Sequence, residues 1–517
     1  MAATNLLFRT PTLYGKTYLL VLTLMLLIAL MPHAAASAIT PRAQLQLLDI
    51  AAAHPTATLD IIVQKATSGA HVEDLVRATG GVVRQDLAII NGFSASIPAR
   101  AIARLARAVG VRWISLDGPV VKSECTQCIS TTNLKNAYIK AIRADTVWNT
   151  GAYLQGQGIG VAMVDSGVNP QQDLYDADGT NRLVASAVFN SGSNQTSSDS
   201  YGHGNHVAGI IGGSGSRSDG AYIGVAPMVN LINVKVSDDQ GGATASNVVA
   251  GLQWILNNKN AYNIRVVNIS LNSTAAESYN TNPIDAAAEI LWFNKIVVVV
   301  SAGNTGNGAL HPPANDPFVI TVGATDDRGT ASISDDTMPA FSAYGTTGDG
   351  FAKPDLVAPG TNIVALMGKT DTVLAQTHPS NVVTYKGARY FRMSGTSMSA
   401  PMVAGAAALL IQSNSNLTPD QVKYRLMATA NKSWSGYTSA KAGAGYLDIA
   451  AATSSTATTN ANTGVTASQL LWTGSQPITW GSANWNSVNW NSVNWNSVNW
   501  NSVNWNSVNW NSDYWGE

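Results

Sequence analysis

Charged side chains are scarce in this sequence. Asp, Glu, Lys and Arg make up only 12% of its 517 residues, about half of the roughly 25% that is typical of soluble proteins. The 30 basic and 31 acidic residues nearly cancel, so no basic excess indicates nucleic acid as a partner. Solubility must therefore depend on Asn, Ser, Thr and Gly, a composition that suits an exported protein.

Cysteine is almost absent as well. The two cysteines, Cys125 and Cys128, form a single Cys-Thr-Gln-Cys pair. One such pair cannot complete a four-ligand zinc site, and no nearby pair of histidines supplies the remaining ligands. Export would permit a small disulfide. The pattern assigns the pair no function.

Long apolar runs are missing except near the N-terminus. There, Arg9 and Lys16 precede an uncharged apolar run at residues 18–31, and small residues follow at 34–38. This order is typical of a secretory signal peptide, which we place at residues 1–38. The apolar run is shorter than the roughly 20 residues that cross a bilayer, although a retained signal anchor stays an alternative. The sequence therefore predicts a secreted, extracellular protein.

Residues 39–128 have the pattern of a small α/β domain. Strands and helices alternate along it, with strands expected at residues 59–63, 81–97 (a pair) and 111–115, and helices at 72–78 and 102–108. The order strand, helix, two strands, helix, strand is ferredoxin-like. Nothing in these residues indicates an active site.

Residues 129–452 alternate apolar runs with helical patterns. The apolar runs lie at residues 160–164, 231–236, 266–270, 296–300 and 318–322, and the helical patterns at 203–211, 246–257, 284–293 and 402–411. Near-continuous apolar runs suit strands that are buried on both faces of a parallel sheet. The prediction is a doubly wound α/β domain with a mainly parallel sheet, whose ligands bind outside the carboxyl ends of the strands.

Four polar residues stand where such a fold places its active site. Asp165 and Asn304 follow predicted strands, and His203 and Ser397 open predicted helices. Each alone has a plainer explanation as a turn former, a helix cap or a structural histidine. A metal at His203 and His206 is a further alternative, but the Glu that a metalloprotease helix requires is missing.

Together, the four residues form the set that acyl transfer needs. Ser397 would attack a carbonyl carbon, and His203 would take the hydroxyl proton and return it to the leaving amine. Asp165 would hold the imidazole tautomer. Asn304 and the backbone N–H of Ser397 would donate to the oxyanion.

The motifs around these residues resemble those of the subtilisin-like serine peptidases (subtilases). They are Val-Asp-Ser-Gly-Val at Asp165, Gly-His-Gly-Asn-His-Val-Ala-Gly at His203, Ser-Ala-Gly-Asn at Asn304, Gly-Thr-Ser-Met-Ser-Ala-Pro at Ser397 and Lys-Pro-Asp-Leu-Val-Ala-Pro-Gly at residues 353–360. The Asp, His, Ser order is also that of subtilisin. The resemblance implies a serine endopeptidase that acts on proteins or peptides through a Ser397 acyl-enzyme. We expect it to be a monomer and to require no cofactor. It also implies that residues 39–128 are an inhibitory propeptide, which the enzyme removes by self-cleavage.

The resemblance further implies that Ser270, Leu271 and Asn272 run beside the bound peptide. Asn272 stands where glycine is usual, and Asn205 stands where relatives usually have Thr, beside His203. Asp173 matches a position that binds calcium in some relatives. The companion loop of that site is not recognisable, so calcium as a structural ion stays an open alternative.

The C-terminal residues fall outside the resemblance. Residues 453–479 are rich in Ser, Thr, Ala and Asn, which predicts a linker. In residues 480–517 a tryptophan recurs every fifth position, mostly within Asn-Trp-Asn-Ser-Val, a spacing that forms no stripe on a helix and alternates faces on a strand. The tail is either disordered without a ligand or a contact surface for cell-surface or polysaccharide partners. In the second case, a rival hypothesis makes the tail the function and the peptidase fold a degenerate scaffold.

Overall fold

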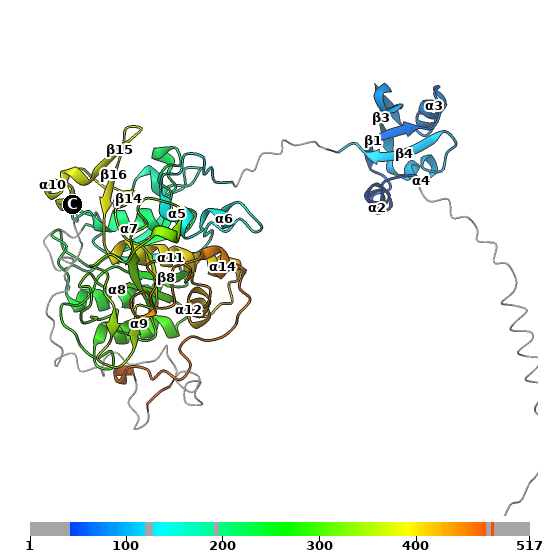
Figure 1. Ribbon diagram of the computed structural model, residues 1–517. Helices are drawn as coiled ribbons and strands as arrows, with labels where there is room; N and C mark the ends of the chain where they lie inside the picture. The colour runs from blue at the N-terminus through cyan, green and yellow to red at the C-terminus, as the bar shows by residue number, and fades with distance from the viewer. Residues whose placement is uncertain (1–41, 119–127, 191–195, 472–476, 480–517) are drawn as a thin grey trace, which may run out of the picture. The chain divides into compact units, whose positions relative to one another are not determined.

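The computed structural model describes residues 42–118, 128–190, 196–471 and 477–479 (Figure 1). The chain divides into two compact units, of which the second begins at Cys125. The predicted signal peptide and the tryptophan repeat lie outside the described residues, as does Cys125, whereas Cys128 is disulfide-bonded. Among the described residues, no helix combines the length and the apolar character that a membrane span requires.

The first unit is a four-stranded antiparallel sheet in the order β2-β3-β1-β4. With the helices that connect the strands, this is the ferredoxin-like arrangement, so that prediction is confirmed. The turn between β2 and β3 places Asn91 at a φ of 48°, a left-handed conformation that Asn tolerates better than most residues. The elements are α2 (Leu45–Ala53), β1 (Thr58–Lys65), α3 (His71–Ala78), β2 (Val82–Leu87), β3 (Gly92–Pro98), α4 (Ile102–Leu105) and β4 (Val111–Leu116).

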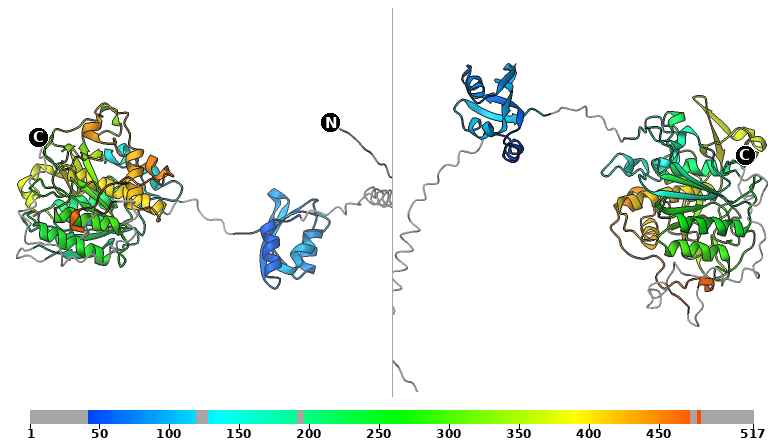
Figure 2. Two further views of the ribbon diagram at one scale, coloured as in Figure 1. Left: turned by 90° about the horizontal axis from the view of Figure 1, so that it is seen from below. Right: turned by 180° about the vertical axis from the view of Figure 1, so that it is seen from behind.

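The second unit is built on a seven-stranded parallel sheet in the order β13-β10-β9-β8-β5-β7-β6. Helices α7 and α11 cover one face of the sheet, and α8 and α9 cover the other (Figures 1 and 2). This confirms the doubly wound α/β fold. The strands are β5 (Gly160–Asp165), β6 (Leu183–Val188), β7 (Asn230–Lys235), β8 (Ile264–Ile269), β9 (Val297–Ser301), β10 (Ile320–Thr325) and β13 (Leu356–Pro359).

Smaller elements complete the second unit. Two of them are sheets outside the main one: the hairpin of β11 (Gly345–Thr346) and β12 (Ala352–Lys353), and the antiparallel sheet of β14 (Ile363–Leu366), β15 (Val382–Tyr385) and β16 (Ala388–Met393). The helices are α5 (Ala137–Ala141), α6 (Asp145–Trp148), α7 (His203–Gly212), α8 (Ala245–Asn258), α9 (Pro283–Phe293), α10 (Val373–Thr377), α11 (Thr396–Ser413), α12 (Pro419–Ala428), α13 (Ser439–Ala442) and α14 (Ile449–Ser454).

Residues 455–471, which we call the strap, were predicted as part of a linker, and for them that prediction is wrong. Asn462 is buried, and its amide donates to the Phe318 carbonyl (3.0 Å) and to Asp420 Oδ1 (2.7 Å). Further along, the backbone N–H of Ser468 donates to both carboxylate oxygens of the buried Glu289, at 3.1 and 2.8 Å. Composition could not reveal this, because Ser, Thr and Asn hydrogen-bond to water and to protein equally well.

We expect Asn462→Ala to lower the free energy of unfolding of the second unit by about 1–3 kcal/mol, because it removes two buried hydrogen bonds, one of them to a carboxylate oxygen. Urea denaturation in the Ser397→Ala background, which prevents self-digestion, measures the effect. Asn460→Ala is the matched control, because the Asn460 side chain is exposed. Equal stability of the two variants would show that the Asn462 bonds do not stabilise the second unit.

Candidate active site

The predicted catalytic residues gather at the carboxyl edge of the parallel sheet. Asp165 is the last residue of β5, and Asn304 follows the end of β9. His203 and Ser397 occupy the first turns of α7 and α11, the two helices on one face of the sheet. The fold therefore brings the ends of four separate elements to one edge.

Asp165 and His203 form a buried pair. His203 Nδ1 lies 2.9 Å from Asp165 Oδ1 and 3.1 Å from Oδ2, and the two side chains are 0% and 1% exposed. Because Nδ1 faces a carboxylate, we assign the imidazole proton to Nδ1, which leaves Nε2 as the basic nitrogen. This is the tautomer that a general base needs.

Close backbone packing holds α7 against the loop that follows β5. A Cβ at Gly204 would lie 2.1 Å from the Gly167 carbonyl oxygen, so only glycine fits at position 204. Asn205 accepts from the Asn169 N–H (2.9 Å) and donates to the Asn169 carbonyl (3.1 Å). Asn205, in place of the usual Thr, therefore forms two hydrogen bonds that tie the start of α7, and with it His203, to the loop after β5.

Ser397 is held by reciprocal bonds with Ser270, which follows β8. The Ser397 hydroxyl donates to the Ser270 carbonyl (3.3 Å), and the Ser270 hydroxyl donates to the Ser397 carbonyl (3.1 Å). In a regular helix, the Ser397 carbonyl would accept from the backbone N–H of residue 401, but Pro401 has none. The proline thus frees the carbonyl that Ser270 uses to fix the nucleophile.

Asn304 is oriented by the residue before the nucleophile. Its Oδ1 accepts from the Thr396 N–H (2.9 Å) and the Thr396 hydroxyl (3.1 Å). These donors fix the amide oxygen, so the NH₂ group points away from them. Within the described residues, that Nδ2 is buried and has no hydrogen-bond partner. An unpaired buried donor beside the start of α11 is the arrangement that an oxyanion hole requires.

A second carboxylate, Asp199, was missed in the sequence. It accepts from the N–H groups of Gly202 (2.7 Å) and Asn205 (2.8 Å) and so caps the start of α7. Ser166 connects it to the catalytic acid, since its hydroxyl lies 2.9 Å from Asp199 Oδ1 and 3.2 Å from Asp165 Oδ1. Burial raises the pKa of Asp199 to about 6, although hydrogen bonds from Asn205 and Gly202 oppose the shift. Only its place four residues before His203 could have drawn attention to it.

His206 is structural. Its Nε2 lies 3.1 Å from the Ile363 carbonyl and 3.0 Å from the Phe391 carbonyl, so this nitrogen is the donor. Burial, with a contribution from His203, lowers the pKa of His206 to about 3 and keeps the ring neutral. The described residues contain no group of three or more His, Cys, Asp or Glu side chains that could hold a metal ion.

Asp173, the possible calcium ligand, is bonded to protein groups, and calcium at this position stays a prediction. Its Oδ1 accepts from the Ser216 hydroxyl (3.1 Å) and the Arg217 N–H (2.7 Å). Its Oδ2 accepts from the Tyr390 hydroxyl (2.9 Å). Both carboxylate oxygens therefore serve protein donors.

The segment predicted to run beside the substrate has its side chains engaged within the protein. Ser270 binds Ser397, Leu271 is 2% exposed, and the Asn272 amide donates to the Ser301 carbonyl at 3.0 Å. Asn272 therefore joins the ends of β8 and β9. A peptide would meet this segment through backbone groups, and its role in substrate binding stays a prediction.

The Lys-Pro-Asp motif belongs to the core. Asp355 is bonded to Lys353 (2.8 Å) and lies 3.3 Å from Lys423. Burial alone would raise the pKa of Asp355, but the two lysines outweigh burial and lower it. The motif therefore fixes β13 and α12 and takes no part in catalysis.

Asp199 should make stability depend on pH. Its folded-state pKa of about 6 lies above its ordinary value of 3.8, so the folded state binds this proton more tightly than the unfolded state. Stability is then lost as pH rises through about 6, by up to about 3 kcal/mol at 1.36 kcal/mol per pKa unit. Urea denaturation of Asp199→Asn and its parent between pH 4 and 7, both in the Ser397→Ala background, should show the variant gaining relative stability as pH rises. Parallel curves would contradict this role.

Comparisons with known proteins agree with this geometry. The model of the subtilase family matches residues 156–446. Serine protease AprX of Bacillus subtilis (strain 168) is 39% identical over 302 residues, which are 57% of this chain and 66% of AprX. Subtilisin Savinase of Lederbergia lenta is 32% identical over 292 residues, which are 56% of this chain and 90% of Savinase.

Among solved structures, a cold-adapted subtilisin-like serine proteinase is 30% identical, with a TM-score of 0.45 over 61% of this chain and 98% of that chain. The family model covers more than half of the 517 residues, and the catalytic residues lie within it. The chain belongs to the subtilase family of serine endopeptidases.

Proposed function

We propose that the protein is a secreted serine endopeptidase that matures by cutting itself from a precursor. The observation that carries this proposal is the Asn304 amide, whose oxygen is fixed by Thr396 while its buried Nδ2 has no partner in the described residues. An unpaired buried donor costs about 1–3 kcal/mol. In an inactive scaffold this donor would only destabilise the fold. In an active enzyme it forms a hydrogen bond to the oxyanion, which stabilises the transition state.

The positions of these residues support the following reaction. The Ser397 hydroxyl attacks the scissile carbonyl carbon while His203 Nε2 takes its proton, and Asp165 stabilises the imidazolium. The oxyanion accepts from Asn304 Nδ2 and from the Ser397 N–H at the positive end of α11. The C–N bond then breaks, and His203 protonates the leaving amine. Water repeats the sequence on the acyl-enzyme and regenerates Ser397.

The precursor organisation rests on the N-terminal residues. Residues 1–38 would direct export, and the ferredoxin-like unit would act as the inhibitory propeptide. Protein or peptide substrates would pair with the backbone of Ser270–Asn272 as an added strand. We propose a monomer without an obligatory cofactor, in which the tryptophan repeat contacts a cell surface or polysaccharide.

Ser397→Ala tests the nucleophile and the maturation step together. The secreted wild type should lose roughly 100 residues after the signal peptide, and the variant should keep them, as intact mass and N-terminal sequencing would show. Thr396→Ser, which retains a hydroxyl beside the nucleophile, is the control and should still mature. Loss of the segment from Ser397→Ala as well would mean that another protease makes the cut. Retention of the segment in the wild type would contradict self-processing.

Asn304→Ala should lower kcat by about 10²–10³ with little change in KM, a scale measured on a subtilisin and carried over here to its relative. The reason is that Nδ2 meets the oxyanion in the transition state, whereas in the free enzyme it has no hydrogen-bond partner among the described residues. Steady-state kinetics on a peptide substrate measures the loss. Asn307→Ala, an exposed position in the same loop, is the control. An unchanged kcat in Asn304→Ala would remove this residue from the mechanism.

A further inference from the structure

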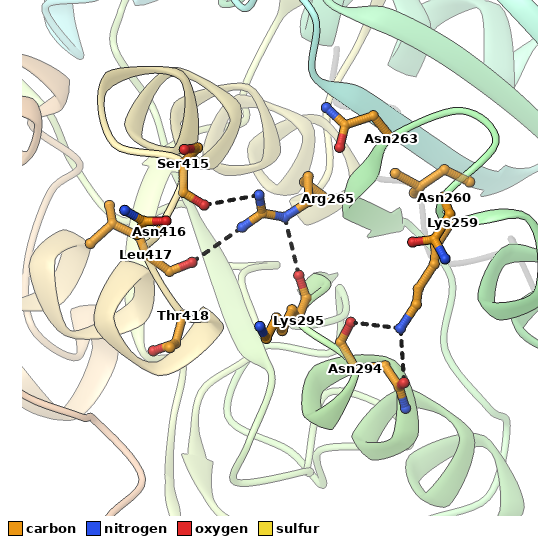
Figure 3. Close-up of a pocket in the computed structure, with 11 residues that line it drawn as sticks. Lys259, Asn260, Asn263, Arg265, Asn294, Lys295, Ser415, Asn416, Leu417 and Thr418 are labelled. Carbon is orange, nitrogen blue, oxygen red and sulfur yellow. Dashed lines mark hydrogen bonds between the residues drawn. The ribbon is translucent and has the colours of Figure 1, made fainter. Parts of the chain in front are cut away.

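A cavity of about 290 Å³ lies at the opposite edge of the sheet from the catalytic residues. It opens where β8 and β9 begin, beside the turn that follows α11 (Figure 3). Neither the catalytic mechanism nor the family motifs use it. Its polar lining includes Lys259, Asn263, Arg265, Asn294, Lys295 and Ser415.

Three cations converge on this cavity without an acid. Lys259, Arg265 and Lys295 line it, and its lining contains no Asp or Glu. Throughout the described part of the chain, none of the three forms a salt bridge with a carboxylate. The whole sequence has a formal net charge of −1, so this local excess of positive charge is not a general property of the protein.

The polar partners of these cations are neutral. The Arg265 guanidinium donates to the Lys295, Ser415 and Leu417 carbonyls at 3.4, 3.1 and 3.2 Å (Figure 3). Lys259 Nζ donates to the backbone and side-chain oxygens of Asn294, at 3.2 and 2.9 Å. These bonds hold the two charged groups in fixed positions at the cavity but leave their charges uncompensated.

Partial burial makes the missing counter-charge costly. Burial lowers the pKa of Lys259, with a further contribution from Lys295, and burial lowers the pKa of Arg265. A cation that leaves water without an opposite charge is destabilised. An anion in the cavity would offset both the desolvation cost and the repulsion between the lysines.

We propose that this cavity is a binding site for a multiply charged oxyanion of the phosphate class. Arg265 offers a planar donor group, the two lysines supply point charges, and Asn263 adds an amide. The volume lies at the small end of ligand pockets, which suits phosphate or sulfate with its bound water better than an organic cofactor. The site does not depend on the peptidase activity.

The position of the cavity gives a bound anion a structural effect. β8 runs from Ile264 to the segment that holds Ser397, and β9 runs from the Lys295 turn towards Asn304. α11 begins at the nucleophile and ends at Ser413, just before Ser415. One anion would therefore join the far ends of three elements whose other ends carry the catalytic groups.

Inorganic phosphate is the probe for the test, titrated by isothermal calorimetry into the full-length Ser397→Ala chain at constant ionic strength in chloride. We expect one saturable phosphate per chain. A thermal midpoint about 3 °C higher is expected when phosphate exceeds its Kd about 100-fold. The double variant Lys259→Gln/Lys295→Asn should bind phosphate at least 10-fold more weakly. Asn suits position 295 because Lys295 has a φ of 68°.

Lys140→Gln/Lys432→Gln is the matched control, because it removes two exposed lysines outside the cavity and should bind phosphate as the parent does. Lys295→Asn alone, which changes only an exposed side chain, is the second variant and should also weaken binding. A parent chain without saturable binding, or cavity variants that bind as tightly as the control, would overturn the proposal. Sulfate in place of phosphate should compete if charge and tetrahedral shape define the ligand, and failure to compete would contradict that ligand class.

Discussion

The buried bond between Asp165 and His203 is the contact around which the catalytic edge is arranged. A carboxylate without solvent must receive hydrogen bonds, and here they come from the imidazole, the backbone N–H of Ser166 and the Ser166 hydroxyl. The same hydroxyl also faces Asp199, which caps α7. One continuous set of hydrogen bonds thus connects the acid, the base and the helix that carries the base.

Much of the fold and of this edge could be predicted because its signals are local. The inner strands are apolar on both faces, and their predicted positions agree with β5, β7, β8, β9 and β10 to within about three residues. β6 was missed because its burial alternates along the strand, and β13 because it has only four residues. Asp199, the Asn205–Asn169 bonds and the path of the strap depend on contacts between segments far apart in the chain, which composition and spacing do not contain.

Sequence motifs and structural roles also diverge. Five segments carried the family resemblance, but their residues have different structural roles. Asp355 neutralises two buried lysines. Pro401 has no backbone N–H, and this leaves the Ser397 carbonyl free to accept from Ser270. Because charged residues are scarce, the charged groups at the two edges of the sheet are easily identified. In a chain with few ionised side chains, the cavity at the amino edge of the sheet gathers three cations with no acid in its lining, while the catalytic edge contains a buried carboxylate with its imidazole.

The strap changes what counts as the folded unit. The family match ends at residue 446, yet buried contacts continue to Leu471, which packs on α9 beside Ala286 and Ile290. A fragment cut at the family boundary would keep every catalytic residue and still leave Glu289 and Asp420 without the donors that the strap supplies. During synthesis the strap also emerges after all the strands of the sheet, so its bonds to Glu289 and Asp420 can form only after every strand has been made.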